Sequence, residues 1–120
     1  SKQSAIRRWL SENFIKKNPE TYKKIYSILD KNSNKDFLKS YEIFVNYTDD
    51  DNALTKIDVD TLITTGKHDV GSTPEMSRNL SKMIPGSKFV EIKGGKHLCS
   101  IECANDVNIT FKKFIDQHND

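Results

Sequence analysis

The chain has 120 residues, which is enough for one domain at most. Only 35% of the residues are hydrophobic, a small share for a domain that must build its own core. The formal net charge is +2 and the basic residues are scattered, so the composition does not indicate a nucleic-acid-binding surface and we expect no nucleic-acid partner.

The first part of the chain is predicted to be helical. Residues 4–13 show helical periodicity, with an apolar face that contains Ile6, Trp9 and Leu10. A second helix should begin at Asn18-Pro19, where asparagine caps the helix and proline fits the first turn. It should end in the polar run at residues 30–33.

A third helix is predicted over residues 35–46. Its apolar face would be formed by Phe37, Leu38, Tyr41, Phe44 and Val45. The acidic run at residues 49–52 ends this pattern, and a short turn that contains Leu54 and Ile57 follows.

The pattern changes at Asp58 to alternating strands and helices. Residues 61–65 are mostly β-branched and predict a buried strand that is closed by Gly66. A helix that begins at Thr73-Pro74, a second strand at residues 88–92 and a last helix at about 104–117 follow. The order predicts two parallel strands joined by a right-handed crossover. Two strands are a poor core by themselves, so the pattern calls for more strands than this chain supplies.

Two polar residues follow the ends of the predicted strands. Asp69 comes three residues after Gly66, and His97 comes five residues after Ile92. Because the carboxyl ends of adjacent parallel strands lie at one edge of a sheet, the carboxylate and the imidazole can meet there. A carboxylate fixes the tautomer of an imidazole and stabilises the imidazolium that forms when histidine takes a proton from a nucleophile.

The whole order of motifs resembles the C-terminal part of an α/β-hydrolase. The motifs are a strand with G-x-x-D, a helix opened by T-P, I-P-G, a strand with G-G-x-H, and a helix that ends in F-x-x-F-I. The runs D-V-G-S-T-P-E-M after Asp69 and H-L-x-x-I-E from His97 look like the 3-oxoadipate enol-lactonase-like branch. Arg8-Trp9-Leu10 is similar to the lid of that branch.

This resemblance implies an α/β fold with two segments. Residues 1–57 would form the helical lid or cap, and residues 58–120 would form the C-terminal β-α-β-α part of the hydrolase core, with two parallel strands. The complete protein would be a serine hydrolase that cleaves a small carboxylic ester or an enol-lactone, without cofactor or metal. Asp69 would be the acid and His97 the base of its triad.

The resemblance also leaves a gap, because no G-x-S-x-G motif occurs in these 120 residues. The serine nucleophile and the oxyanion hole would have to lie upstream, so we expect this chain alone to be inactive. For the substrate contacts two readings stay open. Trp9 either contacts the substrate or anchors the lid, and Leu98 either touches the pocket or packs under its loop.

Other interpretations compete with the enzymatic one. His97, Cys99 and Cys103 could be drawn as metal ligands, but the second distant pair that zinc sites usually have is missing. Cys99 is an unfavourable nucleophile, since it follows the histidine by only two residues. The chain could instead be a stand-alone interaction module derived from the hydrolase fold, or a scaffold that lost its nucleophile. Whichever interpretation holds, we expect the chain to self-associate, because the two-stranded sheet has unpaired edges and the helices expose apolar stripes.

The remaining expectation concerns the location of the protein. The sequence contains neither a secretory hydrophobic region nor a run of roughly 18 apolar residues, so we expect no membrane partner. Two cysteines four residues apart fit reduced thiols. We therefore expect a cytoplasmic protein.

Overall fold

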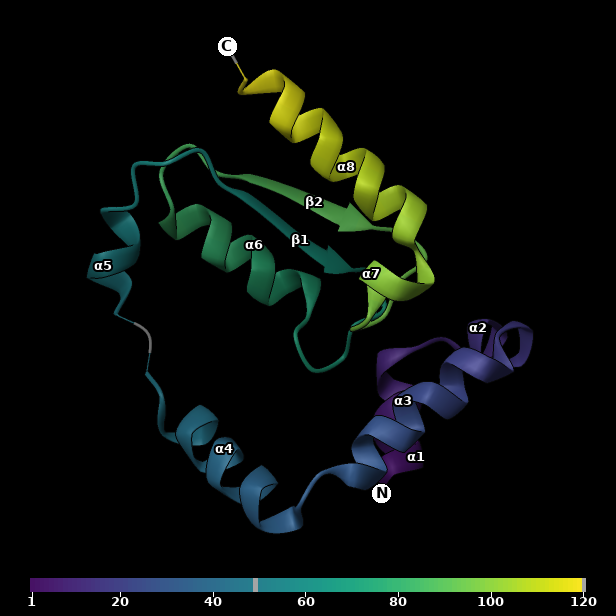
Figure 1. Cartoon of the computed structure of the whole chain (residues 1–120). Helices are drawn as coiled ribbons and strands as arrows, with labels where there is room; N and C mark the ends of the chain where they lie inside the picture. Colours follow the sequence, from purple (N-terminus) through teal and green to yellow (C-terminus); the bar gives the residue numbers. More distant parts are fainter. Residues whose placement is uncertain (49, 120) are drawn as a thin grey trace.

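The computed structural model describes residues 1–48 and 50–119. Asp49, which belongs to the predicted acidic run, and Asp120, the last residue of the predicted C-terminal segment, lie outside the described residues. Five helices precede a β-α-β-α-α order of elements (Figure 1). The predicted α/β class with two parallel strands is confirmed.

The N-terminal helices are α1 (Lys2–Trp9), α2 (Glu12–Lys17) and α3 (Pro19–Lys31). The prediction of one helix over residues 4–13 is wrong, because Leu10 is extended, with φ −128° and ψ 144°. Ser11 then starts α2, and its side chain accepts a hydrogen bond from the Phe14 N–H. Helices α1 and α2 both pack on α3. Ile6 and Leu10 of the first segment are completely buried.

Asn18 serves a different helix from the one predicted. Pro19 is the first residue of α3, as expected, but the Asn18 side chain makes no capping bond to that helix. Its Nδ2 instead donates to the Phe14 carbonyl at 3.0 Å, near the C-terminal end of α2. Because α2 and α3 are separated by this single residue, the amide can satisfy only one of the two helix ends.

Helix α4 (Asn34–Asn46) begins as predicted but does not bury its apolar face. Ser33 caps it by accepting from the Asp36 N–H. The apolar residues Phe37, Leu38, Tyr41, Phe44 and Val45 are each 52–77% exposed. Figure 1 shows α4 standing apart from the sheet, and the short helix α5 (Asp51–Thr55) follows it. A large apolar surface is therefore left open on this part of the chain.

The sheet consists of β1 (Leu62–Gly66) and β2 (Lys88–Ile92), paired in parallel from Leu62 opposite Lys88 to Gly66 opposite Ile92. Helix α6 (Pro74–Met83) connects the strands, and in Figure 1 the sheet lies between α6 and α8 (Ala104–Gln117). The small core here contains the buried Ile84, Ile92 and Val107. Within the described part of the chain each strand is paired on one side only. Because the two strands are parallel, the loops at their carboxyl ends lie at the same edge of the sheet.

Candidate active site

Asp69 sits in a tight loop directly after β1. Its side chain is only 5% exposed, and Oδ1 accepts hydrogen bonds from the backbone N–H groups of Gly71 at 3.0 Å and Ser72 at 2.9 Å. The Thr65 hydroxyl donates to the Ser72 carbonyl at 3.1 Å and closes the loop. Burial by itself would raise the pKa of Asp69, but the bonds from Ser72, His97 and Gly71 outweigh it and hold the pKa below its ordinary value. Asp69 is therefore a carboxylate at neutral pH.

The second carboxylate oxygen of Asp69 meets the ring of His97. Asp69 Oδ2 lies 2.7 Å from His97 Nδ1. Because an ionised carboxylate can only accept, Nδ1 must carry the proton, and Nε2 of the neutral ring is left as the acceptor. The His97 side chain is 45% exposed, so the ring is open to a reacting group. This geometry is that of an acid that orients a base.

Close contact between main chains fixes the loop that carries His97. The Lys67 N–H donates to the Ile92 carbonyl and the His68 N–H donates to the Gly95 carbonyl, each at 2.9 Å. A Cβ on Gly66 would lie 2.3 Å from the Lys96 carbonyl oxygen and 2.5 Å from that of Gly95. Only glycine permits this approach. Gly66 therefore sets how near the end of β1 comes to the loop of His97.

The first turns of the chain hold the same loop from the other side. The Leu98 N–H donates to the Trp9 carbonyl, and the Lys96 ammonium donates to the Arg7 carbonyl, each at 2.9 Å. These carbonyls belong to the last turn of α1, whose acceptors have no partner within the helix. The predicted substrate residues Trp9 and Leu98 are thus linked through their backbones, one on each side of this contact.

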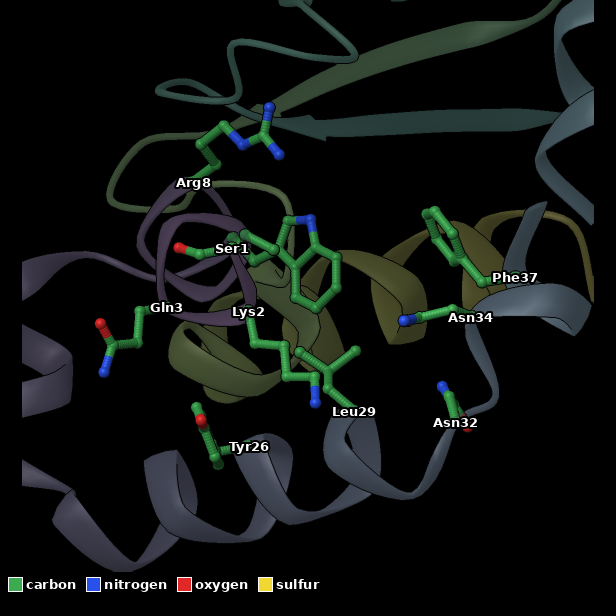
Figure 2. Close-up of a pocket in the computed structure, with 11 residues that line it drawn as sticks. Ser1, Lys2, Gln3, Arg8, Tyr26, Leu29, Asn32, Asn34 and Phe37 are labelled. Carbon is green, nitrogen blue, oxygen red and sulfur yellow. The ribbon is translucent and has the colours of Figure 1, made fainter.

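The side chain of Trp9 faces a cavity of about 740 Å³. Its lining comes from α1, the end of α3 and the start of α4, and includes Arg8, Tyr26, Leu29 and Phe37 (Figure 2). Among the described residues, Asp69, His97 and Leu98 do not line this cavity. Leu98 is half-buried beside His97.

Glu102 is a site residue to which the sequence analysis gave no role, although it is the last residue of the H-L-x-x-I-E run. It ends the short helix α7 (Cys99–Glu102), which was not predicted either. Its Oε1 accepts from the Lys96 N–H at 2.7 Å, next to His97. Its Oε2 accepts from Ser11, from the N–H at 3.1 Å and from the hydroxyl at 2.7 Å. The sequence carries no signal for this contact, because Ser11 and Glu102 are 91 residues apart.

The remaining candidates do not form a second chemical centre. Cys99 and Cys103 are free cysteines, and burial raises the pKa of both thiols, so they are not activated thiolates. Within residues 1–48 and 50–119, no three His, Cys, Asp or Glu side chains are grouped as metal ligands. In the same ranges no helix has the length and apolar character needed to span a membrane.

Solved structures of several enzymes are similar to this chain. The enol-lactonase from Burkholderia xenovorans LB400 is similar with a TM-score of 0.85 and 23% identity, over 95% of this chain and 43% of its own. A thermophilic esterase from Thermogutta terrifontis is similar with a TM-score of 0.83 and 23% identity, over 96% of this chain and 42% of its own. The bromoperoxidase from Bacillus anthracis matches 57% of this chain and 25% of its own, with a TM-score of 0.54 and 31% identity. No family model and no curated protein matches the sequence.

The matched share of each chain shows how much of the enzymes' fold these 120 residues represent. This chain spans 43% and 42% of the lengths of the enol-lactonase and the esterase, although nearly all of its own residues are matched. At 23% identity the likeness establishes the fold and leaves the activity open. The partial coverage fits a C-terminal part. The chain therefore has the α/β-hydrolase fold and represents the C-terminal part of it.

Proposed function

We propose that this chain supplies the acid and the base of a serine hydrolase that cleaves a small carboxylic ester or an enol-lactone. The observation that carries the proposal is the 2.7 Å bond between Asp69 Oδ2 and His97 Nδ1, at the carboxyl ends of two parallel strands. The enol-lactonase and the esterase among the structures of the same fold support this class of substrate. Residues 1–57 would be the lid, and residues 58–120 part of the catalytic core.

The proposed mechanism needs a serine from a part of the hydrolase fold that these 120 residues do not contain. His97 Nε2 takes the proton of that serine as its oxygen attacks the carbonyl carbon of the substrate. The imidazolium, held by Asp69, then gives the proton to the leaving oxygen. A water molecule, deprotonated by the same Nε2, hydrolyses the acyl-enzyme. Backbone N–H groups outside this chain would stabilise the oxyanion.

The lid would close the site over the substrate. We propose that Trp9 contributes to substrate binding, since its carbonyl accepts from the Leu98 N–H and places Trp9 beside the loop of His97. Leu98, whose backbone binds that of Trp9, would border the reacting group beside His97. Two free thiols fit the cytoplasmic location that we propose for the protein.

The gene upstream of the Ser1 codon tests the proposal directly. An open reading frame with G-x-S-x-G between a strand and a helix would support the hydrolase. A stop codon and a start site just before Ser1 would favour a second candidate, a non-catalytic interaction module. The exposed apolar face of α4 and the unpaired strand edges are the observations that favour this alternative.

The isolated 120-residue chain is expected to show no serine-dependent hydrolysis. Without an activated serine, its rate with p-nitrophenyl acetate should not exceed the slow, non-saturating background of its histidine, amino and thiol groups. The measurement compares the wild-type chain with a His97→Ala variant and adds a fluorophosphonate probe. Turnover that the probe abolishes, or covalent labelling of a serine, would contradict the proposal.

The isolated chain is also expected to self-associate. Its apolar face on α4 and the open edges of β1 and β2 would be covered by a second copy. Static light scattering should give a mass above 13.8 kDa that rises with concentration. Phe44→Ser removes a side chain that is 77% exposed and should weaken this association, whereas Lys39→Ser on the same helix should not. A monomer at every concentration would rule the expectation out.

A further inference from the structure

Glu102 joins three segments that are far apart in sequence. One carboxylate oxygen holds the Lys96 N–H in the loop of His97, and the other holds the N–H and the hydroxyl of Ser11. Ser11 lies between α1 and α2 and also caps α2, because its Oγ accepts from the Phe14 N–H at 3.3 Å. The side chain of Glu102 therefore touches both the corner of the lid segment and the loop of the proposed base.

We propose that Glu102 is a positioning residue that couples the α1–α2 corner to His97. The backbone before His97 and the backbone of Ser11 donate to the same carboxylate. A shift of either segment away from Glu102 therefore strains or breaks the hydrogen bonds that link it to the other. The catalytic consequence rests on the proposed function of His97. The coupling itself is a property of this chain and can be measured without any activity.

The chemistry of the contact requires a carboxylate. All three groups that point at Glu102 are donors to it, namely two backbone N–H groups and one hydroxyl. A carboxylate accepts with both oxygens, whereas an amide accepts with one and donates with the other. In Glu102→Gln, the NH₂ group must therefore face either the Lys96 N–H or the Ser11 N–H. One half of the contact is lost although the size of the side chain is kept.

Two other bonds carry the effect from Lys96 to the ring of His97. The Leu98 N–H binds the Trp9 carbonyl on the far side of the histidine, and the Lys96 ammonium binds the Arg7 carbonyl. With Glu102 in place, the residues before and after His97 are both attached to the first helices. When the acceptor of the Lys96 N–H is lost, the loop keeps only the contacts that the Leu98 N–H and the Lys96 ammonium make with α1. The ring then loses its fixed alignment with Asp69.

The test uses the whole chain as wild type, Glu102→Gln, Ser11→Ala and Glu42→Gln, the last being an exposed glutamate of α4 as the matched control. Residue-resolved hydrogen exchange is measured at the amides of Ser11, Lys96 and Leu98. In Glu102→Gln the amides of Ser11 and Lys96 should exchange faster, by about 10- to 100-fold at the one that faces the NH₂ group, the effect of losing one charge-assisted hydrogen bond. The amides of Leu98, β1 and β2 should stay protected. Ser11→Ala should speed exchange at Lys96 as well, in the same direction, although it leaves Glu102 in place.

A second measurement separates positioning from mere support of the fold. ¹⁵N NMR of the imidazole rings reports which nitrogen of His97 carries the proton, with His118 at the C-terminal end as an internal reference. The wild type should have the proton on Nδ1, and Glu102→Gln should shift the population toward the Nε2–H form. Uniformly faster exchange over the whole chain, or an unchanged His97 tautomer, would overturn the proposal. Neither result would bear on whether a hydrolase that contains His97 is active.

Discussion

Asp69→Asn is expected to lower kcat about 10,000-fold in the protein encoded by the complete reading frame, if that frame supplies the serine. Asparagine has the shape of aspartate, so its carbonyl oxygen can still accept from the Gly71 and Ser72 N–H groups. Its NH₂ group then faces His97 Nδ1 in place of the carboxylate oxygen. An NH₂ group donates, so the ring must carry its proton on Nε2 and can no longer accept one from a nucleophile.

The measurement is the steady-state rate with an activated ester, together with circular dichroism to show that the fold is kept. Asp58→Asn serves as the control, since it makes the same chemical change at an exposed aspartate of the same segment and should leave kcat within about twofold of wild type. A kcat for Asp69→Asn close to that of the control would remove Asp69 from the proposed triad. Active wild-type protein that resists fluorophosphonate would remove the serine mechanism altogether.

Gly66→Ala is expected to destabilise the chain by about 3 kcal/mol or more. The added methyl group would meet the carbonyl oxygens of Lys96 and Gly95 at 2.3 and 2.5 Å. Both are main-chain atoms, and the Gly95 carbonyl also accepts from the His68 N–H. They cannot move aside as the end of a flexible side chain could, so the loop of His97 must separate from β1.

Gly71→Ala provides the matched control for this prediction. A Cβ at Gly71 has only Asp69 Oδ1 nearby, at 3.8 Å, and Gly71 is exposed. Urea unfolding followed by circular dichroism should therefore give a large loss for Gly66→Ala and less than about 1 kcal/mol for Gly71→Ala. Equal losses for the two variants would show that the close approach of the main chains has no special importance.

Much of the fold could be predicted because its signals are local. The strand at residues 88–92 and the last helix at 104–117 lie where the periodicity put them. The single helix predicted over residues 4–13 failed for an equally local reason, since the extended Leu10 ends α1 and Ser11 caps α2. The exposure of α4 could not be predicted, because an amphipathic stripe shows that a helix has an apolar face and not which surface covers it.

The candidate site divides in the same way. The meeting of Asp69 and His97 follows from strand order, since parallel strands bring their carboxyl ends to one edge. Glu102 ends the H-L-x-x-I-E run, but that run gives no sign that its partner is Ser11, 91 residues away in the sequence. Periodicity and motif spacing do not predict which side chains of such distant segments come into contact.

The approach of β1 to the His97 loop also bears on how this site can change in evolution. Gly66 meets the carbonyls of Gly95 and Lys96, and a Cβ on Gly95 would in turn lie 2.4 Å from Cys99 Cβ. The separation of Asp69 and His97 is thus set by the close approach of main chains and not by the volumes of core side chains. Apolar residues beneath the sheet can therefore drift in sequence while the distance between the two catalytic candidates is inherited unchanged.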